Sequence, residues 1–174
     1  MVYKVVRYLN SPILERPAGD VTEFDTPELH MLIEDMFETM YASHGIGLAA
    51  PQIDVPKRLT VIDISGGEED RDPERIVLIN PQIVAKEGKQ TGEEGCLSIP
   101  GFREPVTRAR KAVVRAQDVK GVPFEIEGDE LLARAIQHEI DHLNGVLFIN
   151  HLSALKRDLI KRKIRKLQKA GDWE

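Results

Sequence analysis

Apolar side chains recur at helical spacing near the start of the chain. In the stretch TPELHMLIEDMFETMYASHG, residues 26–45, apolar positions three and four residues apart fall on one helix face; they are Leu29, Leu32, Ile33, Met36 and Met40. Thr26 is placed to cap this helix, Pro27 occupies its first position, and Gly45 follows its end. The pattern predicts a first helix between these signals.

The same period returns twice towards the C-terminus. The segment DELLARAIQHEIDHLNG, residues 129–145, predicts a helix that ends at Asn144-Gly145. Its expected buried positions are Leu131, Leu132, Ala135, Ile136 and Ile140. A last helix is predicted from Ser153, with basic residues on its outer face. Its expected apolar face consists of Leu155, Leu159, Ile160, Ile164 and Leu167.

The middle of the chain has the composition of β-strands. Four runs rich in β-branched residues are separated by Gly, Pro, Asn and Asp: RLTVIDI at 58–64, RIVLINPQIVAKE at 75–87, KAVVRAQDVKG at 111–121 and PFEIEG at 123–128. The strands are grouped between helices and do not alternate with them. This order predicts an α+β fold.

Composition narrows the class of protein. The 174 residues, 41% hydrophobic and 30% charged, are typical of one globular domain. No run has the length of a membrane span, and the N-terminus MVYKVVRYLNSP lacks the features of a signal peptide. A single cysteine excludes an internal disulfide bond. We therefore expect a cytoplasmic protein without membrane or DNA partners.

Charge is distributed unevenly along the chain. Eight basic residues and one acid between Ser153 and Ala170 give that segment a charge of +7. The total is −5, so the rest of the chain carries −12. The predicted last helix is therefore a basic helix attached to an acidic body.

The stretch QHEIDHLNG predicts a metal site. His138 and His142 are four residues apart, so they lie on the same helix face, with Glu139 beside them. A catalytic divalent metal normally has three protein ligands and one open position. Two histidines leave one ligand to be found.

The remaining candidates for the third ligand differ in their context. His30 lies among hydrophobic neighbours and suits a packing or surface position, His44 suits a helix C-terminus, and no spacing rule recruits His151. Asp141 points away from the two histidines and suits a supporting or capping role. Cys96 has two other interpretations, a small buried hydrophobe or a nucleophile. Because a thiolate readily binds a divalent metal, we favour Cys96 as the ligand.

Three motifs together resemble those of the peptide deformylases. They are GIGLAAPQ at 45–52, EGCLSIPG at 94–101 and QHEIDHLNG at 137–145, in the same order and at similar intervals. The similarity continues through DMFETMY, VLINP and LFINHLSALKRD, so it predicts one catalytic domain over residues 1–174. The resemblance implies antiparallel or mixed β-sheets around a central HExxH helix. It also implies removal of the formyl group from the N-terminal formylmethionine of newly synthesised proteins, with release of formate.

The resemblance assigns roles to residues of this chain. Cys96, His138 and His142 would hold one divalent metal, usually Fe²⁺ in the family, with Zn²⁺, Ni²⁺ or Co²⁺ able to replace it. Glu139 would transfer protons, while the side chain of Gln52 and the backbone N–H of Leu97 would stabilise the developing oxyanion. The substrate positions that it implies are Ile46, Gly47, Gly95, Arg103, Leu131 and Ala135.

Arg134 departs from the family pattern. It stands in the metal helix where close relatives often carry an apolar residue. Two interpretations are open: the side chain extends to solvent from the pocket rim, or it alters peptide preference.

Two other classes of function compete with deformylation. A metallopeptidase that cuts internal peptide bonds would use the same helix, but it usually takes its third ligand from a downstream histidine or glutamate, and little chain remains for one. A metal-stabilised binding module would need four ligands and would give Glu139 and Gln52 no role. The basic helix also has two interpretations. Its cations can form an ordinary solvated surface, or they can contact phosphates of ribosomal RNA, as the family resemblance implies.

Overall fold

The structure is a computed structural model that describes residues 1–174. The α-helices are α1 (Pro27–Ala42), α2 (Glu130–Leu143) and α3 (Ala154–Ala170). Short 3₁₀ helices are η1 (Pro12–Glu15), η2 (Ala50–Ile53) and η3 (Phe148–His151). The strands are β1 (Gly47–Ala49), β2 (Leu59–Ile62), β3 (Ile76–Glu87), β4 (Gln90–Cys96), β5 (Ile99–Arg108), β6 (Lys111–Gln117) and β7 (Pro123–Asp129).

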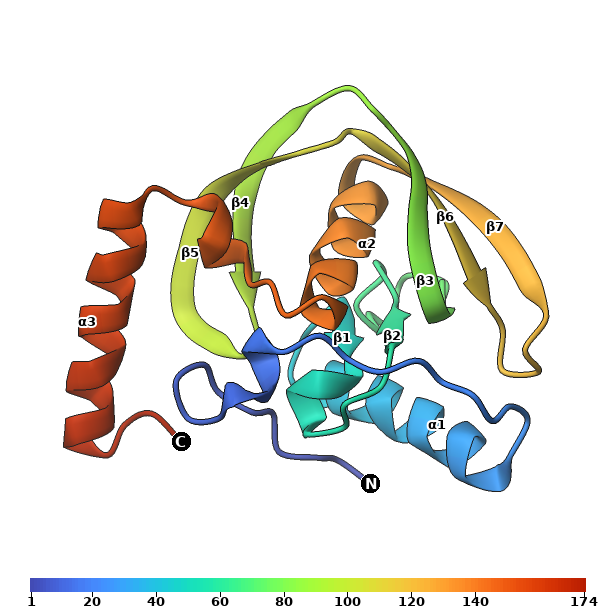
Figure 1. The fold of residues 1–174 in the computed structure, drawn as a ribbon, viewed down its shortest axis with the longest axis horizontal. Coiled ribbons are helices and arrows are strands. Elements are labelled where there is room, and N and C mark those ends of the chain that lie inside the picture. The colour runs from blue at the N-terminus through green and yellow to red at the C-terminus, as the bar shows by residue number, and fades with distance from the viewer.

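Two antiparallel sheets lie on either side of α2 (Figure 1). The larger sheet has the order β1-β2-β3-β6-β7, and β4 pairs with β5 as a separate hairpin. Helix α1 lies below β1 and β2 in this view, and α3 lies beyond β5 at the far edge. The predicted α+β fold, with sheets around a central helix and a helix towards each end of the chain, is confirmed.

The helix boundaries follow the capping signals in the sequence. The Thr26 hydroxyl accepts a hydrogen bond from the Leu29 N–H at 3.1 Å, and α1 begins at Pro27. Ser153 caps α3 in the same way, with its hydroxyl 3.2 Å from the Lys156 N–H. Each cap satisfies a backbone donor that has no partner inside its helix. The three predicted helices are therefore confirmed.

The four predicted strands are present as β2, β3, β6 and β7, but three others were not predicted. Strand β1 has only three residues, and β4 has the sequence QTGEEGC, which is poor in β-branched and aromatic side chains. Its order comes from antiparallel pairing with β5, from Gln90 opposite Arg108 to Cys96 opposite Ile99. Pairing with a partner strand outweighs the weak local propensity here.

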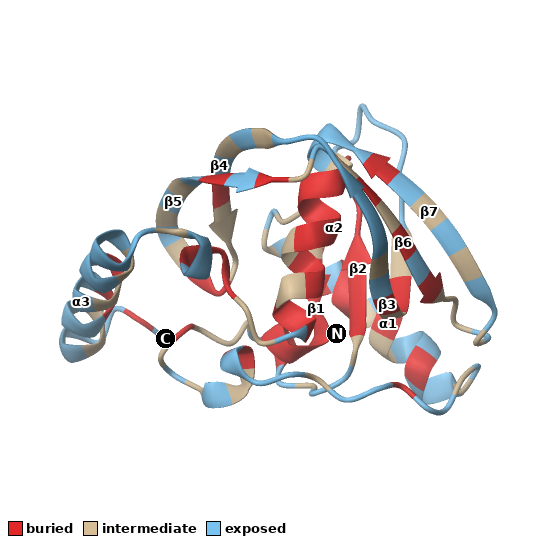
Figure 2. Cartoon of the chain, turned by 45° about the horizontal axis from the view of Figure 1, so that its top comes forward, coloured by how far each residue is buried: buried red, intermediate tan, exposed pale blue.

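The buried side chains form three clusters with α2 at the centre (Figure 2). Ile136 and Ile140 of α2 pack with Ile62 and Leu78 of the large sheet. A second cluster joins α1 to β1 and β2, and a third joins α3 to η3, β5 and the N-terminal segment. Because α2 is packed between the two sheets, side chains on it have fixed positions.

Two predicted apolar helix faces are only partly buried. On α3, Leu155 and Leu159 are 71% and 45% exposed, whereas Ile160 and Ile164 are buried. Leu155 and Leu159 remain exposed because α3 lies at the edge of the molecule and contacts it along a narrow strip. On α2, Leu131 is 46% exposed because it lies in the wall of an open cleft. Each helix in the structure is too short or too polar to cross a lipid bilayer.

Candidate metal centre and active site

Three potential metal ligands from two elements meet beside the cleft. His138 and His142 come from α2, and Cys96 is the last residue of β4. The Nε2 atom of His142 lies 3.3 Å from Cys96 Sγ and 3.2 Å from His138 Nε2. All three ligand atoms lie within 4.8 Å of one another. The structure thus brings together the three residues that the sequence indicated as ligands.

This cluster fits a divalent cation. A thiol and two imidazoles turn their donor atoms towards one shared point, and His142 is fully enclosed, at 1% exposure. Lone pairs directed at a common point repel one another unless a proton or a metal cation lies between them. Two nitrogen ligands and one sulfur ligand suit zinc and similar first-row metals, and three ligands leave a coordination position free.

His138 is oriented by a buried carboxylate. Its Nδ1 lies 2.8 Å from Glu94 Oε1, so Nδ1 donates to Glu94 and Nε2 is left for the metal. Arg108 donates a hydrogen bond to each oxygen of Glu94, from Nε to Oε2 at 2.7 Å and from Nη2 to Oε1 at 2.8 Å. Burial alone would raise the pKa of Glu94, but Arg108 and His138 hold that pKa far below its usual value. Glu94 is therefore ionised wherever the protein is folded at ordinary pH.

The network continues from Arg108 towards the surface. Arg108 Nη1 donates to Asp141 Oδ2 at 2.7 Å, and that oxygen lies 2.8 Å from His151 Nε2. Asp141 thus supports Arg108 and is neither a helix cap nor a ligand in the cluster. His30 pairs with Asp25 at the surface, far along the chain from the site. Neither His30 nor His151 belongs to the cluster of three potential ligands.

Glu139 is a buried carboxylate that faces the cleft. It is 3% exposed, and its Oε1 has no hydrogen-bond partner. Burial raises the pKa of Glu139 to about 7. The backbone of Gly47 passes against it so closely that a Cβ on Gly47 would lie 2.6 Å from Glu139 Oε2. The side chain is thereby confined beside the ligand cluster with one oxygen free to exchange a proton.

Gln52 is held with its amide nitrogen towards the same cluster. Its Oε1 accepts from the Ala49 N–H at 2.9 Å, which fixes the amide orientation. Its Nε2 lies 3.1 Å from Ser98 Oγ and 3.5 Å from Cys96 Sγ. In the turn between β4 and β5, the Leu97 N–H has no acceptor within the protein. Two donors from different segments are therefore present near the ligands.

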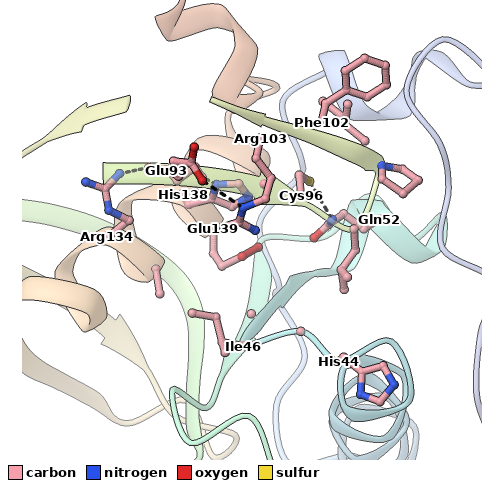
Figure 3. Close-up of a pocket in the computed structure, with 18 of the residues that line it drawn as sticks. His44, Ile46, Gln52, Glu93, Cys96, Phe102, Arg103, Arg134, His138 and Glu139 are labelled. Atoms are coloured by element: carbon pink, nitrogen blue, oxygen red, sulfur yellow. Dashed lines mark hydrogen bonds and ion pairs between the residues drawn. The ribbon is translucent and has the colours of Figure 1, made fainter. Parts of the chain in front are cut away.

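The cleft beside these residues has a volume of about 540 Å³ (Figure 3). It is lined by all six positions that the sequence indicated for substrate, Ile46, Gly47, Gly95, Arg103, Leu131 and Ala135. Ile46 and His44 approach from the loop after α1, whereas Arg103 and Phe102 come from β5 (Figure 3). His44 lies just beyond α1, as predicted, but it also contributes to the rim.

Several residues of the site were missed by the sequence analysis. Glu94 had a local signal, since it lies two residues before Cys96 and alternate residues of a strand share a face. Arg108 had no local sequence signal, because it is brought to Glu94 only by the pairing of β4 with β5. Ser98 and Phe102 were likewise placed only by the fold.

Arg134 does not extend to solvent. It is 7% exposed, and its Nη1 donates to Glu94 Oε2 and to the Val106 carbonyl. The interpretation of Arg134 as a residue that extends from the rim to water is therefore wrong. The hydrogen-bonded ion pair with the buried Glu94 carboxylate holds the Arg134 guanidinium inside the protein.

The fold and the site define a metal-dependent hydrolase, in which an HExxH helix and a cysteine bring three potential metal ligands together beside an open cleft. The family model for polypeptide deformylases matches residues 2–158, and the chain belongs to this family. Enzymes of the family remove the formyl group from the N-terminal methionine of proteins, and they depend on a metal. The resemblance seen in the sequence is thus confirmed.

Named relatives agree with this assignment along nearly the whole chain. A peptide deformylase of Acidobacterium capsulatum is 59% identical over 173 residues, which are 99% of both chains. One of Chromobacterium violaceum is 54% identical over 156 residues, 90% of each. The crystal structure of a peptide deformylase from Legionella pneumophila superposes with a TM-score of 0.88 at 48% identity, covering 100% of this chain and 99% of that one.

Proposed function

We propose that Cys96, His138 and His142 hold one divalent metal and that Glu139 and Gln52 carry out deformylation beside it. The observation that carries this proposal is Glu139: a buried carboxylate oxygen without a partner faces the cleft next to three converging ligand atoms. An unpaired buried charge is costly, so such a group is retained where the chemistry uses it. A purely structural metal site would have no need of it.

The metal is expected to be Fe²⁺ in the cell, with Zn²⁺, Ni²⁺ or Co²⁺ able to take its place. A thiolate with two imidazoles suits this group of ions. When bound, such a metal supplies Lewis acidity, which polarises a carbonyl group and makes a water molecule acidic near neutral pH. The tautomer that Glu94 imposes on His138 leaves Nε2 free for it.

Glu139 is proposed to move the proton. As a carboxylate it accepts a proton from the attacking water, and as an acid it returns that proton to the amine that leaves with the peptide. Burial favours the protonated form of this carboxyl, which helps it to hold the proton before returning it. Its confinement by Gly47 keeps the free oxygen at the cleft.

The two donors are proposed to stabilise the oxyanion. As the formyl oxygen becomes negative, the Gln52 amide and the Leu97 N–H donate to it. The hydrogen bond from Ala49 to Gln52 Oε1 supports this role, because it turns the nitrogen towards the cleft before substrate arrives. Removing one such donor costs about 3 kcal/mol in other enzymes.

Substrate is proposed to lie extended along Ile46, Gly47 and Gly95. Exposed backbone beside a cleft suits main-chain pairing with a peptide. Ile46, Leu131 and Ala135 offer apolar surface for the methionine side chain. Arg103 is 64% exposed beside the cleft, 3.8 Å from Glu93, and is proposed to meet the peptide further along. Formylmethionyl nascent peptides are the proposed substrates, since their N-terminal methionine can lie in this cleft beside the ligand cluster.

The whole chain is proposed to act as one catalytic domain in the cytoplasm. All three apolar clusters contribute walls or supports of the same site, which favours one cooperative unit over residues 1–174. Nascent formylated chains are found where ribosomes work, which supports the cytoplasmic assignment.

Ribosome contact through α3 is a further part of the proposal. The helix projects at one edge of the molecule (Figure 1), and Arg162, Lys163, Arg165 and Lys166 are exposed on it. A row of exposed cations suits RNA phosphates. Docking there would bring the cleft near emerging N-termini.

Formate release tests the proposed function. Protein prepared without oxygen and loaded with Fe²⁺ should release formate from a formylmethionyl peptide and leave internal peptide bonds intact. Glu139→Ala should keep its metal and lose turnover by about 10³-fold or more, since no other group can transfer the proton. Internal cleavage of an unblocked peptide would favour the metallopeptidase alternative, and unchanged turnover in Glu139→Ala would refute the assigned role.

A further inference from the structure

Arg134 lies on the metal helix and lines the cleft, but its guanidinium is tied to the small sheet. Its side chain is 9% exposed, and its Nη1 donates both to Glu94 Oε2 and to the Val106 carbonyl at 3.0 Å. The guanidinium points towards β4 in the close-up (Figure 3). The residue therefore connects α2 to both strands of the small sheet.

The space around this guanidinium is already filled by protein. A Cβ on Gly92 would lie 3.4 Å from Nη2 and 3.7 Å from Cζ of Arg134, so the group packs against bare backbone of β4. Because the residue also lines the cleft, kcat and KM are both needed to separate an effect on the metal from an effect on the peptide.

Glu94 accepts four hydrogen bonds, two on each oxygen. His138 Nδ1 and Arg108 Nη2 lie 2.8 Å from Oε1. Arg108 Nε lies 2.7 Å from Oε2, and Arg134 Nη1 is the other donor to that oxygen. Because Arg108 alone grips both oxygens, the orientation of Glu94 does not require Arg134. What Arg134 adds is a second positive charge.

That charge balances a set of ion pairs centred on Glu94. Two guanidiniums, Arg108 and Arg134, face two carboxylates, the buried Glu94 and the partly exposed Asp141. Without Arg134 the set would carry one excess negative charge, a single hydrogen bond away from His138. An anionic partner on the outer nitrogen makes an imidazole a stronger metal ligand. The second guanidinium withdraws part of that negative charge from His138.

We infer that Arg134 is a positioning residue that acts through Glu94 to limit how strongly His138 binds the metal. This inference rests on the proposed metal site at Cys96, His138 and His142. Weaker donation from the ligand leaves the metal more electron-poor and therefore a better Lewis acid. Removing the charge should tighten metal binding and slow the chemical step.

Three variants separate charge from packing. Arg134→Met removes the charge and keeps an unbranched side chain of similar length. Arg134→Lys keeps the charge and can still donate one hydrogen bond to Glu94, the number that Arg134 donates to it. Arg115→Met is the matched control, because Arg115 pairs with Glu125 at the surface and is 62% exposed. The readouts are the Co²⁺ dissociation constant by chelator competition, the visible Co²⁺ absorption bands, and kcat and KM.

Arg134→Met should bind Co²⁺ more tightly by about tenfold, with shifted absorption bands, lower kcat and unchanged KM. Arg134→Lys should restore the wild-type affinity and bands, and Arg115→Met should match wild type in all readouts. If Arg134→Met does not fold, Arg134→Gln is neutral and polar and serves the same comparison.

Other outcomes would overturn the inference in distinguishable ways. Equal or weaker Co²⁺ affinity in Arg134→Met would refute an effect of charge, and equal changes in Met and Lys variants would assign Arg134 to packing. A rise in KM alone would assign it to the peptide. If wild-type protein fails to bind Co²⁺ through Cys96, the proposed metal site falls and this inference with it.

Discussion

At the scale of single residues, the close approach of Gly47 to Glu139 leads to a direct prediction. A Cβ at position 47 would lie 2.6 Å from Glu139 Oε2 and 2.9 Å from its Cγ, so Glu139 must move in Gly47→Ala. Misplacing a catalytic group by about 1 Å can cost 100-fold in rate. We expect kcat to fall by about that factor while the melting temperature changes little.

The control for this prediction is Gly19→Ala. A Cβ there meets only the Pro56 carbonyl, at the ordinary distance of 3.7 Å. Formate release measured on both variants should fall only in Gly47→Ala. Wild-type activity in Gly47→Ala would show that the position of Glu139 tolerates displacement.

The same scale shows what the sequence can reveal about a site. His138 and His142 are found from helical spacing alone, and Cys96 follows because the chain has one thiol and a metal needs a third ligand. Arg108 cannot be found in this way, since its contact with Glu94 depends on the register of two strands. Arg134 looked like a rim residue because its buried partner was unknown.

At the scale of elements, α3 is attached to the body through the residues that follow it. Trp173 is 3% exposed, its Nε1 donates to the Tyr8 carbonyl at 2.7 Å, and its ring meets Phe102 edge-on. Trp173→Ala would leave the space of the indole ring empty and the Tyr8 carbonyl without its donor. We expect a loss of about 3 kcal/mol in the free energy of unfolding, at the lower end for a buried tryptophan because the chain end can relax.

Urea unfolding of Trp173→Ala and Leu155→Ala tests this attachment. Leu155 lies on the same helix but is 71% exposed, so its removal should change stability by less than about 0.5 kcal/mol. Similar transitions in the two variants would mean that the tail is not a structural anchor.

Element predictions succeeded where patterns are local. The helices have caps and periodic apolar faces within their own sequence, as Thr26 and Ser153 show. Strand β4 has no such pattern, and only its partner β5 gives it a structure. The exposed side of α3 escaped prediction for a related reason: an amphipathic pattern does not reveal how much of the apolar face finds a partner.

At the scale of the whole molecule, the separation of charge predicts how the protein meets the ribosome. Exposed cations of α3 are expected to contact RNA phosphates, so Arg162, Lys163 and Lys166 changed together to Gln should weaken cosedimentation with ribosomes. The salt slope of binding should fall by about one for each cation that no longer pairs with a phosphate. Substitution is preferable to deleting residues 153–174, because α3 buries Ile160 and Ile164 against the body.

A variant with the same change in charge elsewhere provides the comparison. Arg110, Arg115 and Lys120 are exposed on the side of the larger sheet, and their replacement by Gln also removes three cations. Cosedimentation should survive in that variant. Equal loss in both, or no loss in the α3 variant, would argue against docking through this helix.

The central claim is that one sulfur and two imidazoles hold a single metal ion, and cobalt substitution of wild type and Cys96→Ser tests it most directly. We predict one Co²⁺ per wild-type chain, with a near-ultraviolet thiolate-to-cobalt absorption band that disappears in Cys96→Ser together with most of the affinity. The same stoichiometry, affinity and spectrum in both proteins would contradict the account.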